Sequence, residues 1–179
     1  MDLASLMKLA QQNLPLKGKI DGETELTIDP TMIQQPSGKI KIKAGAIELP
    51  NSQIPTPIGP LDLPAIKLSE LQIYGNLKDR VLNLDSSSFG TSKDELSGKI
   101  DGTLGLQFDN FGGHVQPRLT NYELRLDMRV KDRLAREQTV GFALTFLEKC
   151  KQKGDGGTLA FRCRIAGNAF GGAAQISTF

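Results

Sequence analysis

The pentapeptide Gly-Lys-Ile-Asp-Gly occurs twice in this chain, at residues 18–22 and again at residues 98–102. Leucines lie in the same register around both copies, giving the shared pattern Leu-x-Gly-Lys-Ile-Asp-Gly-x-x-x-Leu. Side chains of a β-strand point to opposite faces in turn, so this period of two predicts two amphipathic strands. We call the face that carries Ile20 and Ile100 the dry face, and the face that carries Asp21 and Asp101 the wet face.

Both glycines of each copy fall on the dry face. Glycine inside a strand marks a bend, a bulge or the close approach of another backbone. One interpretation is a groove floor kept low for a ligand. The other, which we favour, is sheet curvature and packing against a neighbouring element. A phosphate-binding loop is excluded, because it requires a different spacing and a strand–turn–helix context.

The length of 179 residues suits a single domain, residues 1–179, that is large enough for a hydrophobic core. The net charge is +2, and lysines alternate with acids along the strands, so nucleic acid is not expected as a partner. No stretch approaches the roughly 20 apolar residues of a transmembrane helix. The protein is therefore expected either to be cytosolic or to begin, in this chain, after a removed anchor or signal peptide.

Alternating segments recur along most of the chain and predict an antiparallel meander of about seven to nine strands. The expected fold is mainly β, with one highly curved sheet shaped like a half-barrel or taco. Helical spacing predicts a short N-terminal helix over residues 1–14 and one amphipathic helix over residues 133–152. A phase change beside Gly45 predicts a β-bulge, and residues 76–80 are typical of a hairpin turn.

Residues 50–64 contain five prolines and cannot form a central strand, since proline lacks the ladder donor. This segment is either a proline-rich ligand for a partner domain or a connector that packs over the sheet. We favour the connector, because Ile54, Ile58, Leu61 and Leu63 suit packing.

The predicted dry face is too large for the predicted helix to cover. Seven or eight strands present roughly 1,200 Å² of apolar surface, whereas one helix covers about 300 Å². The sheet must curl on itself, or a loop, partner or apolar ligand must cover the rest. The candidate residues for contact with a ligand or partner are Ile20, Leu26, Ile42, Leu104, Leu106, Leu124, Leu126 and Phe161.

Enzyme chemistry is not expected, and no catalytic, metal-binding or cofactor-binding residue is assigned. A Gly-x-Ser-x-Gly elbow is missing, and the single histidine, His114, serves poorly for a triad. Cys150 and Cys163 are too few for a zinc site. They are either a disulfide formed in an oxidising compartment or two ordinary buried thiols.

Several segments, taken in order, resemble protein N of the bacterial type II secretion system, in the form with an AsmA-like periplasmic domain. The resemblance runs from Leu16 to the C-terminus, and the segments that carry it are residues 37–43, 68–75, 83–90, 95–106, 122–130 and 154–167.

This resemblance implies the periplasmic β-domain of an inner-membrane protein, whose only contact with the membrane is a short N-terminal anchor that this chain lacks. It implies a non-enzymatic accessory role in protein secretion, with other subunits of the apparatus as partners. An alternative is a carrier in which the concave dry face holds lipid or another apolar ligand. The family supplies no catalytic residues that could be transferred to this chain.

Overall fold

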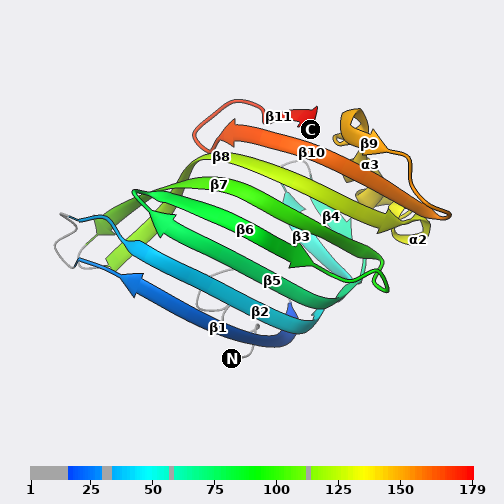
Figure 1. Cartoon of the computed structure of the whole chain (residues 1–179). Helices are drawn as coiled ribbons and strands as arrows, with labels where there is room; N and C mark the ends of the chain where they lie inside the picture. Colours follow the sequence, from blue (N-terminus) through cyan, green and yellow to red (C-terminus); the bar gives the residue numbers. More distant parts are fainter. Residues whose placement is uncertain (1–15, 30–33, 57–58, 112–113) are drawn as a thin grey trace.

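The computed structural model describes residues 16–29, 34–56, 59–111 and 114–179, and it is built on one large antiparallel sheet (Figure 1). The strands of this sheet are β1 (Lys17–Thr27), β2 (Ser37–Leu49), β5 (Ile66–Lys78), β6 (Val81–Phe89), β7 (Leu96–Phe111), β8 (His114–Lys131), β9 (Lys151–Gln152), β10 (Thr158–Asn168) and β11 (Gln175–Thr178). The prediction of a mainly β protein with one antiparallel sheet is confirmed. The helix predicted over residues 1–14 lies outside the described residues.

Strand order follows chain order almost throughout, as β1-β2-β5-β6-β7-β8-β10-β11, with β9 paired to β10 beside this path. Each of the pairings is antiparallel. The order ends at β1 and β11, which do not pair with each other. The described strands therefore form an open sheet rather than a closed barrel.

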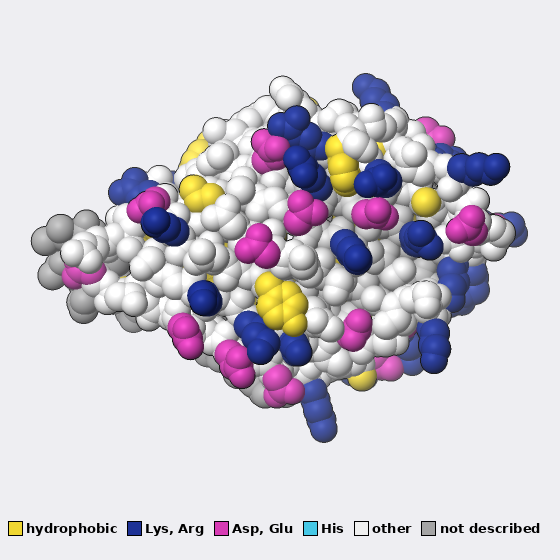
Figure 2. Space-filling view, in the orientation of Figure 1, with side chains coloured by type: hydrophobic (Ala, Val, Ile, Leu, Met, Phe, Trp, Pro, Cys, Tyr) yellow, Lys and Arg dark blue, Asp and Glu magenta, His cyan; other side chains and the backbone are white. Residues whose placement is uncertain are grey.

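The two copies of the repeat lie in equivalent surroundings on one side. In β1, Asp21 pairs with Lys43 of β2; in β7, Asp101 pairs with Arg125 of β8. Opposite charges that face each other across strands stabilise the pairing. The wet face, seen in Figure 2, carries acidic and basic side chains mixed together, as the alternation predicts.

Three strands contain an extra residue that shifts their register. These irregularities lie in β2 beside Gly45, in β6 between Leu84 and Ser87, and in β8 opposite the step from Leu104 to Leu106. Ala46 of β2 has a φ of 50°, a backbone conformation typical of a bulge. The bulge predicted beside Gly45 is therefore confirmed.

The proline-rich segment forms a separate two-stranded hairpin, β3 (Ser52–Thr56) and β4 (Gly59–Leu63). The sequence predicted a connector, and it missed this ladder. Pro55 and Pro60 face each other in it. Proline is tolerated there because each strand of a two-stranded ladder is an edge strand. In Figure 1 the hairpin lies behind the sheet, on the side away from the viewer.

Helical structure near the C-terminus is shorter and more broken than predicted. In place of one helix over residues 133–152, the chain forms α2 (Asp132–Ala135), α3 (Gln138–Thr145) and the 3₁₀ turn η1 (Glu148–Cys150). Glu137 is extended, with a ψ of 130°, and this separates α2 from α3. The residues at this break, Arg136 and Glu137, are good helix formers, so helix propensity does not explain where the helix is interrupted.

These short helices cover one end of the dry face. Leu134 of α2 and Leu144 of α3 pack with Val130, Phe161 and Cys163, in a core cluster that also contains Cys150. Cys150 and Cys163 are joined by a disulfide, with their Cα atoms 5.3 Å apart. The bond attaches η1 directly to β10. We call this group of residues the helix-end cluster.

A second, smaller cluster lies near the other edge of the sheet. Ala44 and Ile47, on either side of the β2 bulge, are its buried members, and the residues packed against them are Leu16, Ile20, Leu68 and Leu71. Because the bulge changes the phase of β2, side chains separated by three positions reach the same cluster. We call this group the β1-end cluster.

Candidate functional site

The dry face brings the predicted candidate residues together. By strand register, Ile20 lies opposite Ala44, and Ile42 lies opposite Ile73. Further along the sheet, Leu104 lies opposite Leu82 and Tyr122. The alternation of each strand then places all of them on one side: Ile20, Leu26, Ile42, Leu104, Leu106, Leu124, Leu126 and Phe161.

Exposure varies strongly across this face. Phe161 is 1% exposed beneath α2 and α3, so it belongs to the covered end and cannot contact a ligand. Ile42, Leu104 and Leu124 are only partly buried. At the β1 edge, Leu26 is 38% exposed. The dry face is therefore buried unevenly, and Phe161 lies in its covered part.

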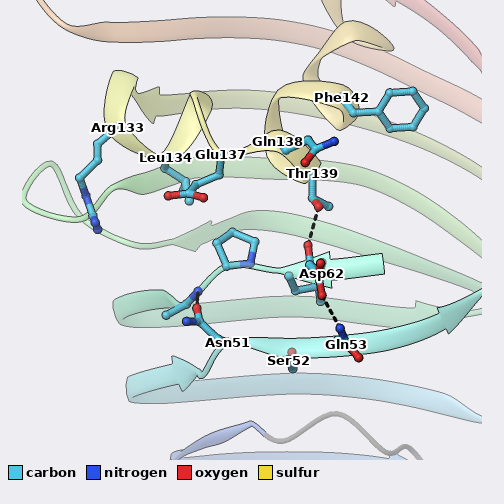
Figure 3. Close-up of a pocket in the computed structure, with 13 residues that line it drawn as sticks. Asn51, Ser52, Gln53, Asp62, Arg133, Leu134, Glu137, Gln138, Thr139 and Phe142 are labelled. Carbon is cyan, nitrogen blue, oxygen red and sulfur yellow. Dashed lines mark hydrogen bonds between the residues drawn. The ribbon is translucent and has the colours of Figure 1, made fainter. Parts of the chain in front are cut away.

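A cleft of about 1180 Å³ separates the β3–β4 hairpin from α2 and α3 (Figure 3). The Thr139 hydroxyl donates a hydrogen bond to the carbonyl oxygen of Asp62, which joins α3 to β4. The Gln53 amide donates to the Asp62 carboxylate at 2.7 Å, across the hairpin. These bonds hold the two walls of the cleft together at one point.

The lining of the cleft is mixed. Apolar surface comes from Leu134 and from Phe142, which is 60% exposed. The Ser52 hydroxyl is buried and has no hydrogen-bond partner among the described residues. Arg133 is held by Glu95 through two hydrogen bonds from its guanidinium group.

Sequence reasoning missed this cleft, because its walls come from segments far apart in the chain. Asp62 and Thr139 are separated by 77 positions, and neither lies in a recognisable motif. In the sequence, Thr139 is only one polar residue within the helix predicted over residues 133–152. The one available signal was that the prolines of residues 50–64 exclude that segment from the centre of the sheet.

The Asp94 carboxylate accepts four hydrogen bonds. Asp94, in the loop between β6 and β7, accepts bonds from the backbone and hydroxyl groups of both Ser69 and Thr91, at distances between 2.6 and 3.1 Å. Burial acts to raise the pKa of Asp94, but these bonds outweigh it and hold the pKa below the ordinary value of an aspartate. The arrangement fixes a loop and is not poised for proton transfer at neutral pH.

Metal binding finds no support in the part of the chain that the structure describes. Within those residues, no group of three or more His, Cys, Asp or Glu side chains could hold an ion. The charged side chains of the wet face form exposed pairs, such as Arg164 with Glu123 at 2.9 Å and Arg162 with Asp127 at 3.5 Å. Pairs of this kind contribute little to stability and are not a catalytic constellation.

Fold and site together define a mainly β protein with one amphipathic antiparallel sheet whose apolar face is only partly buried. The chain matches no protein-family model, no curated protein and no solved structure. The resemblance to protein N of the type II secretion system therefore stays a prediction. Among the described helices, none has the length and apolar character needed to span a bilayer.

Proposed function

We propose that this chain is a non-enzymatic binding protein that works through the uncovered part of its dry face. The observation that carries the proposal is the incomplete burial of that face, on which exposed and partly buried residues lie beside buried ones such as Leu77. Phe161 is buried under helices, whereas Ile42 and Leu104 are only partly buried and Leu26 is exposed. A large apolar surface in contact with water is unfavourable, and such patches mark sites of interaction.

The proposed setting is the bacterial type II secretion apparatus, with the chain as an accessory periplasmic domain and other subunits as partners. The order of the segments that resemble protein N supports this setting. The disulfide between Cys150 and Cys163 supports an oxidising compartment. We further propose that the sheet curves toward its dry face, since bulges such as the one at Ala46 bend and twist strands.

Site-specific photo-crosslinking in secreting cells tests the protein-contact role. A photoreactive side chain at Leu104 faces the dry side, and one at Thr103 faces the wet side as a matched control. We expect crosslinks to secretion-system subunits from position 104 and far fewer from position 103. No crosslink from position 104, together with normal secretion when the gene is deleted, contradicts the role.

The second candidate function is a carrier of lipid or another apolar ligand, favoured by the aliphatic character of the partly buried dry-face residues. Native mass spectrometry of the purified protein tests it. We expect bound phospholipid, lost in Leu104→Asp but retained in Thr103→Asp, with circular dichroism confirming that both variants fold. Protein that carries no lipid and takes up none from phospholipid vesicles contradicts this function.

A further inference from the structure

The strand β1 lies at the end of the sheet order and pairs, among the described strands, only with β2 (Figure 1). Residues 21–28 are all exposed, although they alternate between the dry and wet faces. Leu26 and Ile28, on the dry face, are 38% and 50% exposed. This part of the edge is therefore open on both faces. An open edge presents backbone donors and acceptors to which another strand can pair.

A comparison of the two copies of the repeat shows which neighbouring strand is lacking beside β1 among the described residues. Its second copy, in β7, lies between two strands: β8 places Leu124 opposite Gly102, and β6 places Leu84 there from the other side. In the first copy, β2 places Ile42 opposite Gly22. β1 and β7 run in the same direction in the same sheet, so β2 corresponds to β8. No described strand corresponds to β6 beside residues 21–27.

The space around the glycines agrees with this comparison. A Cβ atom on Gly98 would lie 2.6 Å from the ring of Phe89, the residue that β6 places opposite it. The equivalent glycine of β1 is Gly18, and the three atoms nearest to a Cβ atom there, at 3.3 to 3.4 Å, belong to Gly45, Ala46 and Ile47 of β2. At Gly22, inside the proposed edge, the only described atoms within 4 Å of such a Cβ atom belong to Lys41 and Ile42 of β2, so none lies on the side away from β2.

The charges on the wet side of β1 indicate which residues an added strand would carry on that side. The wet side of this edge carries Asp21, Glu23 and Glu25, and of these only Glu23 forms an ion pair with a described residue, Lys41 at 3.2 Å. An added strand with basic residues on the wet side would pair with the others. A second copy of β1 would set acids against acids in any central antiparallel register, which is unfavourable.

We propose that the edge of β1 over residues 21–27 binds an extended segment of another protein, added as a further strand in which apolar and basic residues alternate. Such strand addition gains affinity from backbone hydrogen bonds and specificity from alternate side chains. The proposal concerns the edge of the sheet and does not depend on what covers the dry face.

A synthetic peptide with the sequence of residues 37–44, Ser-Gly-Lys-Ile-Lys-Ile-Lys-Ala, is a suitable probe, because this sequence already pairs with β1 inside the fold. Hydrogen exchange is measured on the intact protein with the peptide added. We expect slower exchange over residues 21–27, with no change over residues 98–102. The same peptide with glutamate in place of each lysine is expected to give no protection.

The repeat supplies a matched pair of variants. Asp21→Lys is expected to weaken peptide binding about tenfold, because a like charge replaces an attraction. Asp101→Lys makes the same change in the same pentapeptide, at the centre of the sheet, and is expected to leave affinity within about twofold. Thermal melts followed by circular dichroism establish that both variants fold.

Three results would each overturn the proposal. One is no protection of residues 21–27 at a peptide concentration of about 1 mM, since a weaker interaction is not specific recognition. Another is an equal loss of binding in Asp21→Lys and Asp101→Lys. The third is a homodimer in sedimentation equilibrium that buries β1, which would make a second copy of this chain the occupant.

Discussion

Gly22 and Gly102 hold the same position in the repeat but lie in different surroundings. Gly102 has a φ of 136°, and a Cβ atom there would lie 2.1 Å from the carbonyl oxygen of Glu123. Gly22 has only ordinary contacts, the nearest at 3.6 Å. Glycine is therefore required at position 102, where the backbone conformation and the close approach of β8 exclude a Cβ atom, but not at position 22.

We expect Gly102→Ala to destabilise the protein by about 2–4 kcal/mol, because the backbone would be strained and the adjacent strand displaced. Gly22→Ala is expected to be neutral or to stabilise by up to about 1 kcal/mol, since it restricts the unfolded chain without a clash. Urea denaturation of both variants measures the difference. Equal effects would mean that the two copies do not differ in packing.

The turn between β5 and β6 contains two residues with an unusual backbone conformation. Asp79 and Arg80 both have positive φ, 50° and 66°, as a two-residue hairpin loop of this kind requires. Glycine is the favoured residue at the second position. We expect Arg80→Gly to stabilise the protein by about 1 kcal/mol in urea denaturation. Arg80→Ala keeps the strain and serves as the control; a gain there would contradict the explanation.

Asp94 predicts a specific dependence of stability on pH. Its pKa is lowered in the folded protein, so its contribution is complete above about pH 4, the pKa range of an unfolded aspartate. The contribution is lost as the pH falls through the lower, folded pKa. The difference in unfolding free energy between the wild type and Asp94→Asn should therefore be constant from pH 5 to 7 and shrink below about pH 4. If this difference in unfolding free energy instead grew as the pH fell, the pKa of Asp94 would be raised in the folded protein and not lowered.

At the scale of elements, alternation predicted the strands of the main sheet and Gly45 marked the bulge in β2. Period and turn chemistry are local signals, so they are visible in one sequence. The break at Glu137 was not predicted, because the apolar residues that indicated the helix, from Val140 to Cys150, all lie after it and carry no signal of a break there. The β3–β4 ladder and the cleft beside it depend on contacts between distant segments, such as the bond from Thr139 to Asp62. Local patterns carry no information about such contacts.

The cover of the dry face depends on a few side chains of the short helices. Leu144 is 8% exposed in the helix-end cluster, whereas Phe142, two positions earlier on α3, is 60% exposed. We expect Leu144→Ala to lower the free energy of unfolding by about 2–4 kcal/mol. Phe142→Ala should change it by less than about 1 kcal/mol. Similar losses in the two variants would place Phe142 against a surface that the fold does not show.

At the scale of the whole molecule, buried residues fall into two clusters at opposite parts of the sheet. The helix-end cluster holds Phe161 and the disulfide, and the β1-end cluster holds Ala44 and Ile47. On β5, between the two clusters in strand order, Leu77 is also buried, whereas Ile42, Leu104 and Leu124 are only partly buried. Regions with few buried apolar contacts open more readily than the rest of a protein, so stability should differ along the sheet.

Hydrogen exchange with and without reduction measures this difference. We expect amides of β10 to exchange more slowly than those of β1 while the disulfide is intact. The bonded cysteines are 13 positions apart, and closing such a loop stabilises by about 3 kcal/mol. Reduction should therefore accelerate exchange in β10 by up to about a hundredfold and leave β1 within about twofold. Equal acceleration of exchange in β10 and β1 would contradict this expectation and show that the sheet opens as a single cooperative unit.

The agreement between strand order and chain order has a consequence for how such a chain can change in length. When each strand pairs with the next one, a hairpin can be duplicated or deleted without rerouting any connection. β1–β2 and β7–β8 have the form of such duplicates, since Asp21 faces Lys43 as Asp101 faces Arg125. Homologous chains should then differ in length by whole pairs of strands, and the number of pentapeptide copies would count the duplications.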